Sequence, residues 1–367
     1  MKILANNLKK QYDLYKDEYD AKAIQILNSG WYILGEEVKS FEKEFAEYIS
    51  CKYCVGLASG LDALQIAFRA LQIGDKDEVI VCSNAYIACI MGITMNGATP
   101  IFVEPDEYDN IDAKRIEDKI TINTKAILAV HLYGQSCDMT KIMNIAKKYN
   151  LKIVEDCAQA HGTKWNNKNV GTYGDISCWS FYPTKNLGAF GDGGAITTNN
   201  EEYAEQARII RNYGANKTHY DNEVVGLNSR LDELQAGLLR IKLSHLDELN
   251  NERIKIANRY NNEINNQYIK PLNTRPGSNN IYHQYVIHVS NGKRNELMEY
   301  LKENEIGTII HYPIPSPLQT AYKYLNYKTG DFPIAEKYAS EILSLPMYNG
   351  MSKEEQDYII SIINNFE

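Results

Sequence analysis

The 367-residue sequence lacks any apolar run that approaches the length needed to cross a membrane, and its N-terminus lacks the pattern of a secretory signal peptide. We therefore expect a cytoplasmic protein with no membrane partner. Basic residues are not in excess either, because 39 Lys and Arg stand against 47 Asp and Glu, for a formal net charge of -8. This charge argues against a general nucleic-acid-binding surface but is compatible with a local basic pocket for a small anion.

The sequence also lacks the spacing of a zinc site. Its seven cysteines include a single Cys-x-x-Cys pair, at residues 51–54, with no second pair and no histidines at matching spacing. Most of the seven lie in apolar runs, so we expect reduced, buried thiols and no metal. No Gly-x-Gly-x-x-Gly follows the first strand-like run, which disfavours a dinucleotide-binding Rossmann enzyme.

Short apolar runs alternate with amphipathic segments along most of the chain. The periodicity predicts helices that include residues 37–49 and 139–148, and strands at 78–82, 99–103, 126–130, 151–154, 176–181 and 195–198. Such alternation is typical of an α/β domain with a mainly parallel sheet. From about residue 231 the pattern changes to one long helix over 231–264, followed by a smaller α+β unit. We expect a large domain at 1–240 and a small C-terminal domain at 241–367.

Two side chains near the ends of predicted strands favour one cofactor. Asp156 follows the apolar run 151–154, at the carboxyl end of a strand, where open α/β sheets place their sites. Lys185 follows the aromatic-rich strand 176–181. Pyridoxal 5'-phosphate (PLP) requires a lysine that forms a Schiff base and a carboxylate that keeps its pyridine nitrogen protonated. Taken alone, however, Asp156 is a common type of turn residue and Lys185 a common surface charge.

The residues around this pair strengthen the PLP prediction. Ser59 and Gly60 open a predicted helix, and a helix N-terminus binds phosphate, although Ser59 alone would be an ordinary N-cap. Gln159 lies three residues after Asp156, within reach of a ring hydroxyl. Residues 188–195 form a glycine-rich turn that permits close approach to a cofactor. We interpret the conjunction as a PLP site made of Ser59, Asp156, Gln159, Ser180 and Lys185.

Five motifs, in this order, resemble those of the DegT/StrS-type sugar aminotransferases: residues 58–64 (ASGLDAL), 155–162 (EDCAQAHG), 180–186 (SFYPTKN), 191–194 (GDGG) and 226–230 (GLNSR). The resemblance extends from near residue 25 to the C-terminus. It implies an aspartate-aminotransferase-like fold (fold type I of the PLP enzymes), with an α/β large domain and a smaller C-terminal α+β domain. It also implies an activity that aminates keto sugars carried on nucleotides.

The resemblance assigns roles to individual residues. Lys185 would bind the cofactor covalently and later move a proton between the cofactor and the sugar, and Asp156 would pair with the pyridinium. Further cofactor contacts would come from Ser59, Gly60, Tyr86, Gln159, Ser180 and Asn228. Among these, Tyr86 would stack on the ring. Asn228 would reach the neighbouring subunit's site, which implies an obligate homodimer.

Residues 59–64, 131–135 and 185–192 look most like the branch that aminates C3 of dTDP-linked 3-keto-6-deoxyhexoses, with L-glutamate as the amino donor. Its product would serve the biosynthesis of deoxyaminosugars for O-antigen, S-layer or other glycans. Leu61 departs from the family, which commonly has threonine there, so one hydroxyl near the phosphate is missing. The expected substrate contacts are Tyr182, His311 and Tyr312 for the sugar, with Lys217 and Arg230 for the diphosphate.

Three alternatives stay open on the sequence. Amination at C4 of a UDP- or dTDP-linked 4-keto sugar fits the same motifs. A PLP-dependent sugar dehydratase has the same scaffold but carries histidine in place of the lysine, so Lys185 argues against it. A non-enzymatic regulator that kept the fold would have no need of a complete set of cofactor residues.

Overall fold

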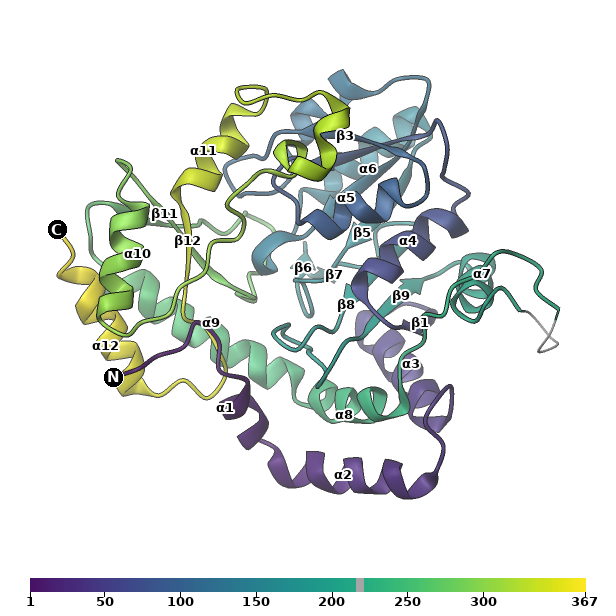
Figure 1. The fold of residues 1–367 in the computed structure, drawn as a ribbon, viewed down its shortest axis with the longest axis horizontal. Coiled ribbons are helices and arrows are strands. Elements are labelled where there is room, and N and C mark those ends of the chain that lie inside the picture. Colours follow the sequence, from purple (N-terminus) through teal and green to yellow (C-terminus); the bar gives the residue numbers. More distant parts are fainter. Residues whose placement is uncertain (216–220) are drawn as a thin grey trace.

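The computed structural model describes residues 1–215 and 221–367, and its larger unit is built on a seven-stranded sheet (Figure 1). The strand order is β1-β9-β8-β5-β4-β2-β3. The pairs from β3 across to β8 are parallel, whereas β9 runs antiparallel to both β8 and β1. The prediction of a mainly parallel sheet is therefore confirmed. The strands are β1 (Tyr53–Leu57), β2 (Glu78–Cys82), β3 (Thr99–Val103), β4 (Thr124–Val130), β5 (Lys152–Asp156), β8 (Ile176–Ser180) and β9 (Gly194–Thr198).

Helices cover this sheet because its strands are apolar on both faces. Those that contact it are α3 (Glu36–Ile49), α4 (Gly60–Ala70), α5 (Ile87–Thr94), α6 (Met139–Tyr149) and α7 (Glu201–Arg211). In α3 the buried residues Val38, Phe41, Phe45 and Ile49 recur at helical spacing and pack in the large core. The helix expected at residues 37–49 is thus present, and its apolar face holds it against β1.

The N-terminus of α3 is capped from another helix. Gly35 supplies no side chain there. Instead the buried carboxylate of Glu233 accepts hydrogen bonds from the backbone N–H groups of Gly35, Glu37 and Val38, at 2.8, 2.9 and 3.0 Å. Three amides that a helix start leaves unpaired are thereby satisfied by one acid nearly 200 positions away in the sequence.

The single helix expected over residues 231–264 is instead two helices, α8 (Glu233–Ser244) and α9 (Leu246–Glu263). They meet at His245, whose ring stacks on Tyr15 with 3.8 Å between ring centroids. α8 packs against α3 and α2 (Lys16–Ser29), whereas α9 contributes Ile256 and Tyr260 to a second, smaller core. The break lets each helix bury its apolar side against a different unit. The apolar periodicity is continuous through His245, so it does not predict this break.

The smaller unit contains an antiparallel sheet of three strands, in the order β10-β11-β12. Its elements are β10 (Ile269–Pro271), β11 (Tyr285–Val289), α10 (Arg294–Glu303), α11 (Pro333–Glu341), β12 (Ile342–Leu345) and α12 (Lys353–Asn364). Further elements are α1 (Leu8–Asp13), a short hairpin of β6 (Lys164–Trp165) and β7 (Lys168–Asn169), and several short 3-10 helices. None of the described helices combines the length and apolar character required to cross a lipid bilayer.

Residues on each side of position 240 pack in the core formed mainly by the other side. Ile3 lies in the second core and pairs with Ile306 through a β-bridge, so both chain ends lie beside the smaller unit (Figure 1). Conversely, Tyr322 and Phe332 pack in the first core. The division into domains at 1–240 and 241–367 therefore stays a prediction.

Candidate active site

A cavity of about 490 Å³ lies at the carboxyl ends of β4, β5 and β8, and residues 283–284 and 311–312 complete its wall from the smaller unit. It is the place where most of the residues singled out in the sequence come together. Those that line it are Ser59, Gly60, Tyr86, Asp156, Gln159, Ser180, Tyr182, Lys185, His311 and Tyr312. Five segments far apart in the chain thus contribute to one site.

Two of the expected residues that the structure describes, Asn228 and Arg230, are not in this cavity. Asn228 is exposed on the surface, where its backbone pairs with Asn212. Arg230 donates a hydrogen bond to Oδ1 of Asn212 at 3.1 Å, and its guanidinium lies 5.5 Å from the ring centroid of Tyr213. Lys217 lies outside the described residues. A single chain therefore does not bring Asn228 or Arg230 to its own site.

Lys185 is held by a tight turn after β8. Its backbone N–H donates to the carbonyl of Tyr182 at 2.8 Å, and a side chain at Gly188 would meet the carbonyl oxygen of Pro183 at 2.3 Å. Lys185 is partly buried in the wall of the cavity, and this burial lowers the pKa of Lys185 from 10.5 to about 8, although the negative charge of Asp156 acts in the opposite direction. The amine is thus far more often neutral at physiological pH than that of an ordinary lysine, as a nucleophilic lysine requires.

Asp156 is the last residue of β5, and 6% of its surface is exposed. One carboxylate oxygen, Oδ1, accepts a hydrogen bond from the backbone N–H of Ala158 at 3.0 Å. The other, Oδ2, lies 3.0 Å from Sγ of Cys89 in α5. Each oxygen therefore has one donor from the protein and keeps capacity for a further donor from the cavity.

The start of α4 forms a cradle that fits a phosphate. Ser59 caps the helix by accepting a hydrogen bond from the backbone N–H of Asp62 at 3.1 Å. A Cβ atom at Gly60 would lie 2.5 Å from Cβ of Ser180, so only glycine lets these two backbones approach. The first amides of a helix have no intrahelical acceptor, and the helix dipole favours an anion in front of them. The hydroxyl of Ser180 lies at the same place.

Gln159 connects the two units across the cavity. Its Oε1 accepts a hydrogen bond from the backbone N–H of Tyr133 at 2.7 Å, and its Nε2 donates to the hydroxyl of Tyr312 at 3.2 Å. The ring of Tyr312 lies against that of Tyr86, with centroids 4.9 Å apart and planes inclined by 31°. Stacking of Tyr86 on the cofactor ring stays a prediction. Tyr133, which the sequence did not single out, fixes the amide of Gln159.

His311 is held by two polar partners. Gln284 Nε2 lies 2.9 Å from Nε2 of His311, and Ser344 Oγ lies 2.9 Å from its Nδ1. Because an amide nitrogen only donates, Nε2 accepts and Nδ1 carries the proton. Burial, together with the charge of Lys185, lowers the pKa of His311 to about 4, so the ring is neutral. Gln284 and Ser344 come from strand-forming segments whose sequence pattern gives no sign of this contact.

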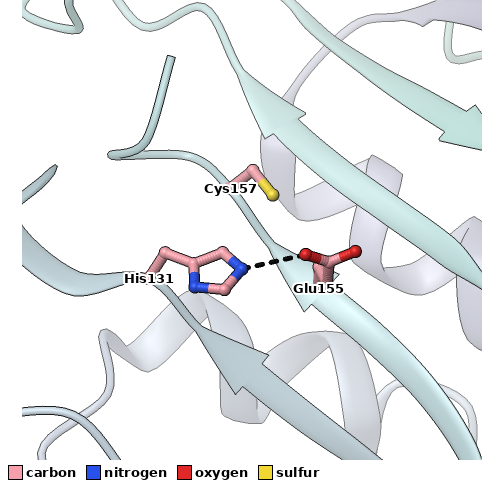
Figure 2. Close-up of side chains that lie close together, drawn as sticks. All are labelled: His131, Glu155 and Cys157. Atoms are coloured by element: carbon pink, nitrogen blue, oxygen red, sulfur yellow. Dashed lines mark hydrogen bonds and ion pairs between the residues drawn. The ribbon is translucent and has the colours of Figure 1, made fainter. Parts of the chain in front are cut away.

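Figure 2 shows a second polar cluster, made of His131, Glu155 and Cys157, which adjoins the site because His131 is also part of the cavity lining. Glu155 and His131 are fully buried, with His131 Nε2 3.1 Å from Oε2 of Glu155. The carboxylate also accepts hydrogen bonds from further groups at 2.7–3.3 Å, namely the backbone N–H groups of Gly171, Tyr173 and Gly174 and the hydroxyl of Ser177. Successive strand residues point to opposite faces, so Glu155 holds the loop at 171–174 while Asp156 faces the cavity.

Geometry alone makes His131, Glu155 and Cys157 a possible group of metal ligands. The chemistry of the three does not fit a metal. The backbone N–H of Cys137 donates to Nδ1 of His131 at 3.1 Å, so the proton is on Nε2, which faces Glu155. Burial raises the pKa of Cys157 well above its ordinary value, which keeps it a thiol. We assign the cluster to the support of β5.

The cavity fits PLP in its chemistry. It presents a lysine of lowered pKa, a carboxylate with free acceptor capacity and a helix N-terminus against which Gly60 leaves room. These three features correspond to the aldehyde, the ring nitrogen and the phosphate of the cofactor. Cys178 and Leu61 line the same cavity and leave part of its wall apolar.

Comparison with known proteins places the chain in a family. The model of the DegT/DnrJ/EryC1/StrS aminotransferase family matches residues 14–364. A dTDP-3-amino-3,6-dideoxy-alpha-D-galactopyranose transaminase from Aneurinibacillus thermoaerophilus is 52% identical over 353 residues, which are 96% of each chain. A dTDP-3-amino-3,4,6-trideoxy-alpha-D-glucose transaminase from Streptomyces venezuelae is 41% identical over 362 residues, 98% of this chain and 95% of the relative.

Solved structures of similar proteins lead to the same family. DesV from S. venezuelae, in complex with a ketimine intermediate, superimposes with a TM-score of 0.96 at 40% identity, over 99% of this chain and 98% of that one. Further solved relatives are in forms with PLP and with its amino form, PMP. Similarity of this extent over the full length confirms the fold type I prediction. The chain belongs to the DegT/DnrJ/EryC1/StrS aminotransferase family and is a PLP-dependent aminotransferase.

Proposed function

We propose that the protein transfers an amino group from L-glutamate to the C3 keto group of a dTDP-linked 3-keto-6-deoxyhexose, in the biosynthesis of a deoxyaminosugar. The observation that carries this proposal is the single cavity in which Lys185, Asp156 and the start of α4 meet. The choice of C3 and of a dTDP carrier is supported by the 52% identical relative, a transaminase named for a 3-amino-3,6-dideoxyhexose on dTDP.

PLP, when bound, accepts the amino group of the donor and acts as an electron sink during its transfer to the sugar. The residues of this chain bind and orient it. The backbone at Gly60, with Ser59 and Ser180, would hold the phosphate, and Asp156 would hold the protonated ring nitrogen. Gln159, whose amide is held by Tyr133 and Tyr312, would contact the ring oxygen.

Lys185 is the catalytic base of the proposed reaction. Since burial lowers the pKa of Lys185 to about 8, its free amine is able both to take up a proton and to release it near neutral pH. In the second half of the reaction Lys185 Nζ delivers a proton to C3 of the sugar. A histidine at this position would not bind the cofactor covalently. The presence of Lys185 therefore disfavours the hypothesis of a sugar dehydratase.

The sugar contacts that we propose lie on the side of the cavity formed by the smaller unit. His311 and Tyr312 line it there, and Tyr182 lies at its mouth with 53% of its surface exposed. The neutral ring of His311 is already bound to Gln284 and Ser344. We therefore infer that His311 shapes the sugar pocket by a fixed ring orientation rather than by an ionic contact.

We further propose an obligate homodimer in which Asn228 completes the neighbouring subunit's site. Among the described residues that line the cavity, Lys185 is the one lysine or arginine, whereas the cofactor phosphate and the sugar diphosphate bring several negative charges. Asn228 and Arg230 lie outside their own cavity, and Ser229 between them fixes the loop to α4 by donating to Oδ2 of Asp62 at 2.6 Å. Arg230 and Lys217 are the candidate contacts for the diphosphate.

Two experiments test the function. In the first, Lys185→Ala should abolish both the visible absorbance of the lysine-bound cofactor and turnover, while Lys242→Met, which removes a buried lysine outside this cavity, should keep the absorbance. Retained turnover in Lys185→Ala would refute the assignment.

In the second experiment, the enzyme is incubated with L-glutamate and 3-keto or 4-keto sugars on dTDP or UDP, and the mass and coupling constants of the product are measured. We expect amination of the 3-keto dTDP sugars; a product aminated at C4 would overturn the choice of C3.

A further inference from the structure

Cys89 lies against the acid of the cofactor site. It is the third residue of α5, and 1% of its surface is exposed. Its Sγ lies 3.0 Å from Oδ2 of Asp156, a contact that is fully buried. Since Oδ1 is already bound by the backbone N–H of Ala158, the thiol is the side-chain contact that limits rotation of the carboxylate.

The thiol donates in this contact. Burial and the charge of Asp156 raise the pKa of Cys89 well above its ordinary value, so the sulfur keeps its proton. An S–H group is a weaker donor than a hydroxyl or an amide. It therefore fixes the direction of the carboxylate while withdrawing little of its negative charge, which a hydroxyl in the same place would reduce further.

Cys89 is also tied to the wall of the cavity. Its backbone N–H donates to the carbonyl of Tyr86 at 2.9 Å, and Tyr86, Ile87 and Ala88 all line the cavity. The first turn of α5 thus carries both the aromatic side chain that faces the site and the thiol that contacts its acid. A displacement of this turn would move Tyr86 and Asp156 together.

We propose that Cys89 is a positioning residue, whose S–H orients the carboxylate of Asp156 toward the cofactor ring nitrogen and leaves it a strong acceptor. This inference rests on the proposed role of Asp156. It predicts that the chemical nature of the donor at position 89, and not only the volume of the side chain, sets the protonation of the cofactor ring.

The contact is tested first without the cofactor, by infrared spectroscopy of the S–H stretch in the cofactor-free protein. Cys89→Ala identifies the band of this thiol. Asp156→Asn should shift that band to higher wavenumber, because a neutral amide is a weaker acceptor than a carboxylate. Cys178→Ala removes another buried thiol beside the site and should leave the band in place. A Cys89 band that does not respond to Asp156→Asn would overturn the proposal.

The consequence is tested in the holoenzyme with PLP labelled by ¹⁵N at its ring nitrogen. In Cys89→Ser the stronger donor should lower the pKa of the ring nitrogen, whereas Cys89→Ala should raise the dissociation constant of PLP about fivefold, the effect of losing one hydrogen bond. Wild-type behaviour in both variants would overturn the role of Cys89 alone. A ring nitrogen that is unprotonated in the wild-type enzyme would overturn the role of Asp156 and this inference with it.

Discussion

The lowered pKa of Lys185 gives the most direct physical test of the site. Burial brings this pKa from 10.5 to about 8, and Asp156 and Cys89 offset part of the effect. At pH 7 a group with a pKa of 8 is neutral in about one molecule in ten, against about one in 3,000 for an ordinary lysine. The cofactor-free protein should therefore present a lysine that reacts with electrophiles at a pH where other lysines are protected by their charge.

The informative perturbation is Asp156→Asn. Its carboxylate stabilises the ammonium form of Lys185, so replacing it by a neutral amide removes an influence that raises the pKa. The pKa of Lys185 should then fall below 8. Asp118→Asn makes the same change of charge at an exposed carboxylate outside the cavity and should leave this pKa unchanged.

The assay is competitive acetylation of the cofactor-free protein between pH 6 and 11, with the modified Lys185 peptide quantified by mass spectrometry. The denatured protein supplies the reference for an ordinary lysine. We expect a midpoint near 8 in the folded wild type and a lower one in Asp156→Asn. A wild-type midpoint near 10.5 would refute the argument from burial, and a midpoint raised by Asp156→Asn would refute the argument from charge.

Two further predictions concern the support of the site and its assembly. Burial alone would raise the pKa of Glu155, but hydrogen bonds from His131 and from backbone amides lower it below the unfolded value of 4.5. Its stabilisation is thus complete above pH 4.5 and is lost as the pH falls through the lower folded value. Glu155→Gln should lower the free energy of unfolding, measured in urea at pH 7, by about 3 kcal/mol, and should make this free energy less dependent on pH in the acid range. An unchanged dependence on acid pH would contradict the reasoning. Mixed dimers of Asn228→Ala and Lys185→Ala subunits should regain part of the wild-type turnover, since one of their two sites is then intact; inactive mixed dimers would show that Asn228 does not act across subunits.

The sequence predicted those site residues whose position follows from the helix or strand next to them in the chain. Asp156 is the last residue of a buried strand, Lys185 lies in the turn that follows another, and Ser59 directly precedes an amphipathic helix, so periodicity places each at or near an element boundary. The resemblance to a family then added Tyr86. The mainly parallel sheet was predictable for the same reason, because each of its strands is a short apolar run that a single chain segment specifies.

The sequence did not predict the contacts that hold these residues in place. Cys89 and Asp156 are 67 positions apart, and Gln284 meets His311 across two different segments of the smaller unit. No local pattern marks such pairs, because each depends on the packing of elements that are distant in the chain. The break at His245 has the same origin, since it depends on which unit each helix contacts.

The neighbouring acids Glu155 and Asp156 show how the structure separates support from function. Both are buried, and both lie at the end of β5. From the sequence alone, only their order at the end of this strand distinguishes them. The carboxylate of Glu155 accepts hydrogen bonds from five groups of the protein, so it has no capacity left for a ligand. The carboxylate of Asp156 accepts two, one of them from a weak thiol donor, and faces the cavity. A buried charge with so few partners is costly by itself, and we infer that the ring nitrogen of PLP supplies the partner that it lacks.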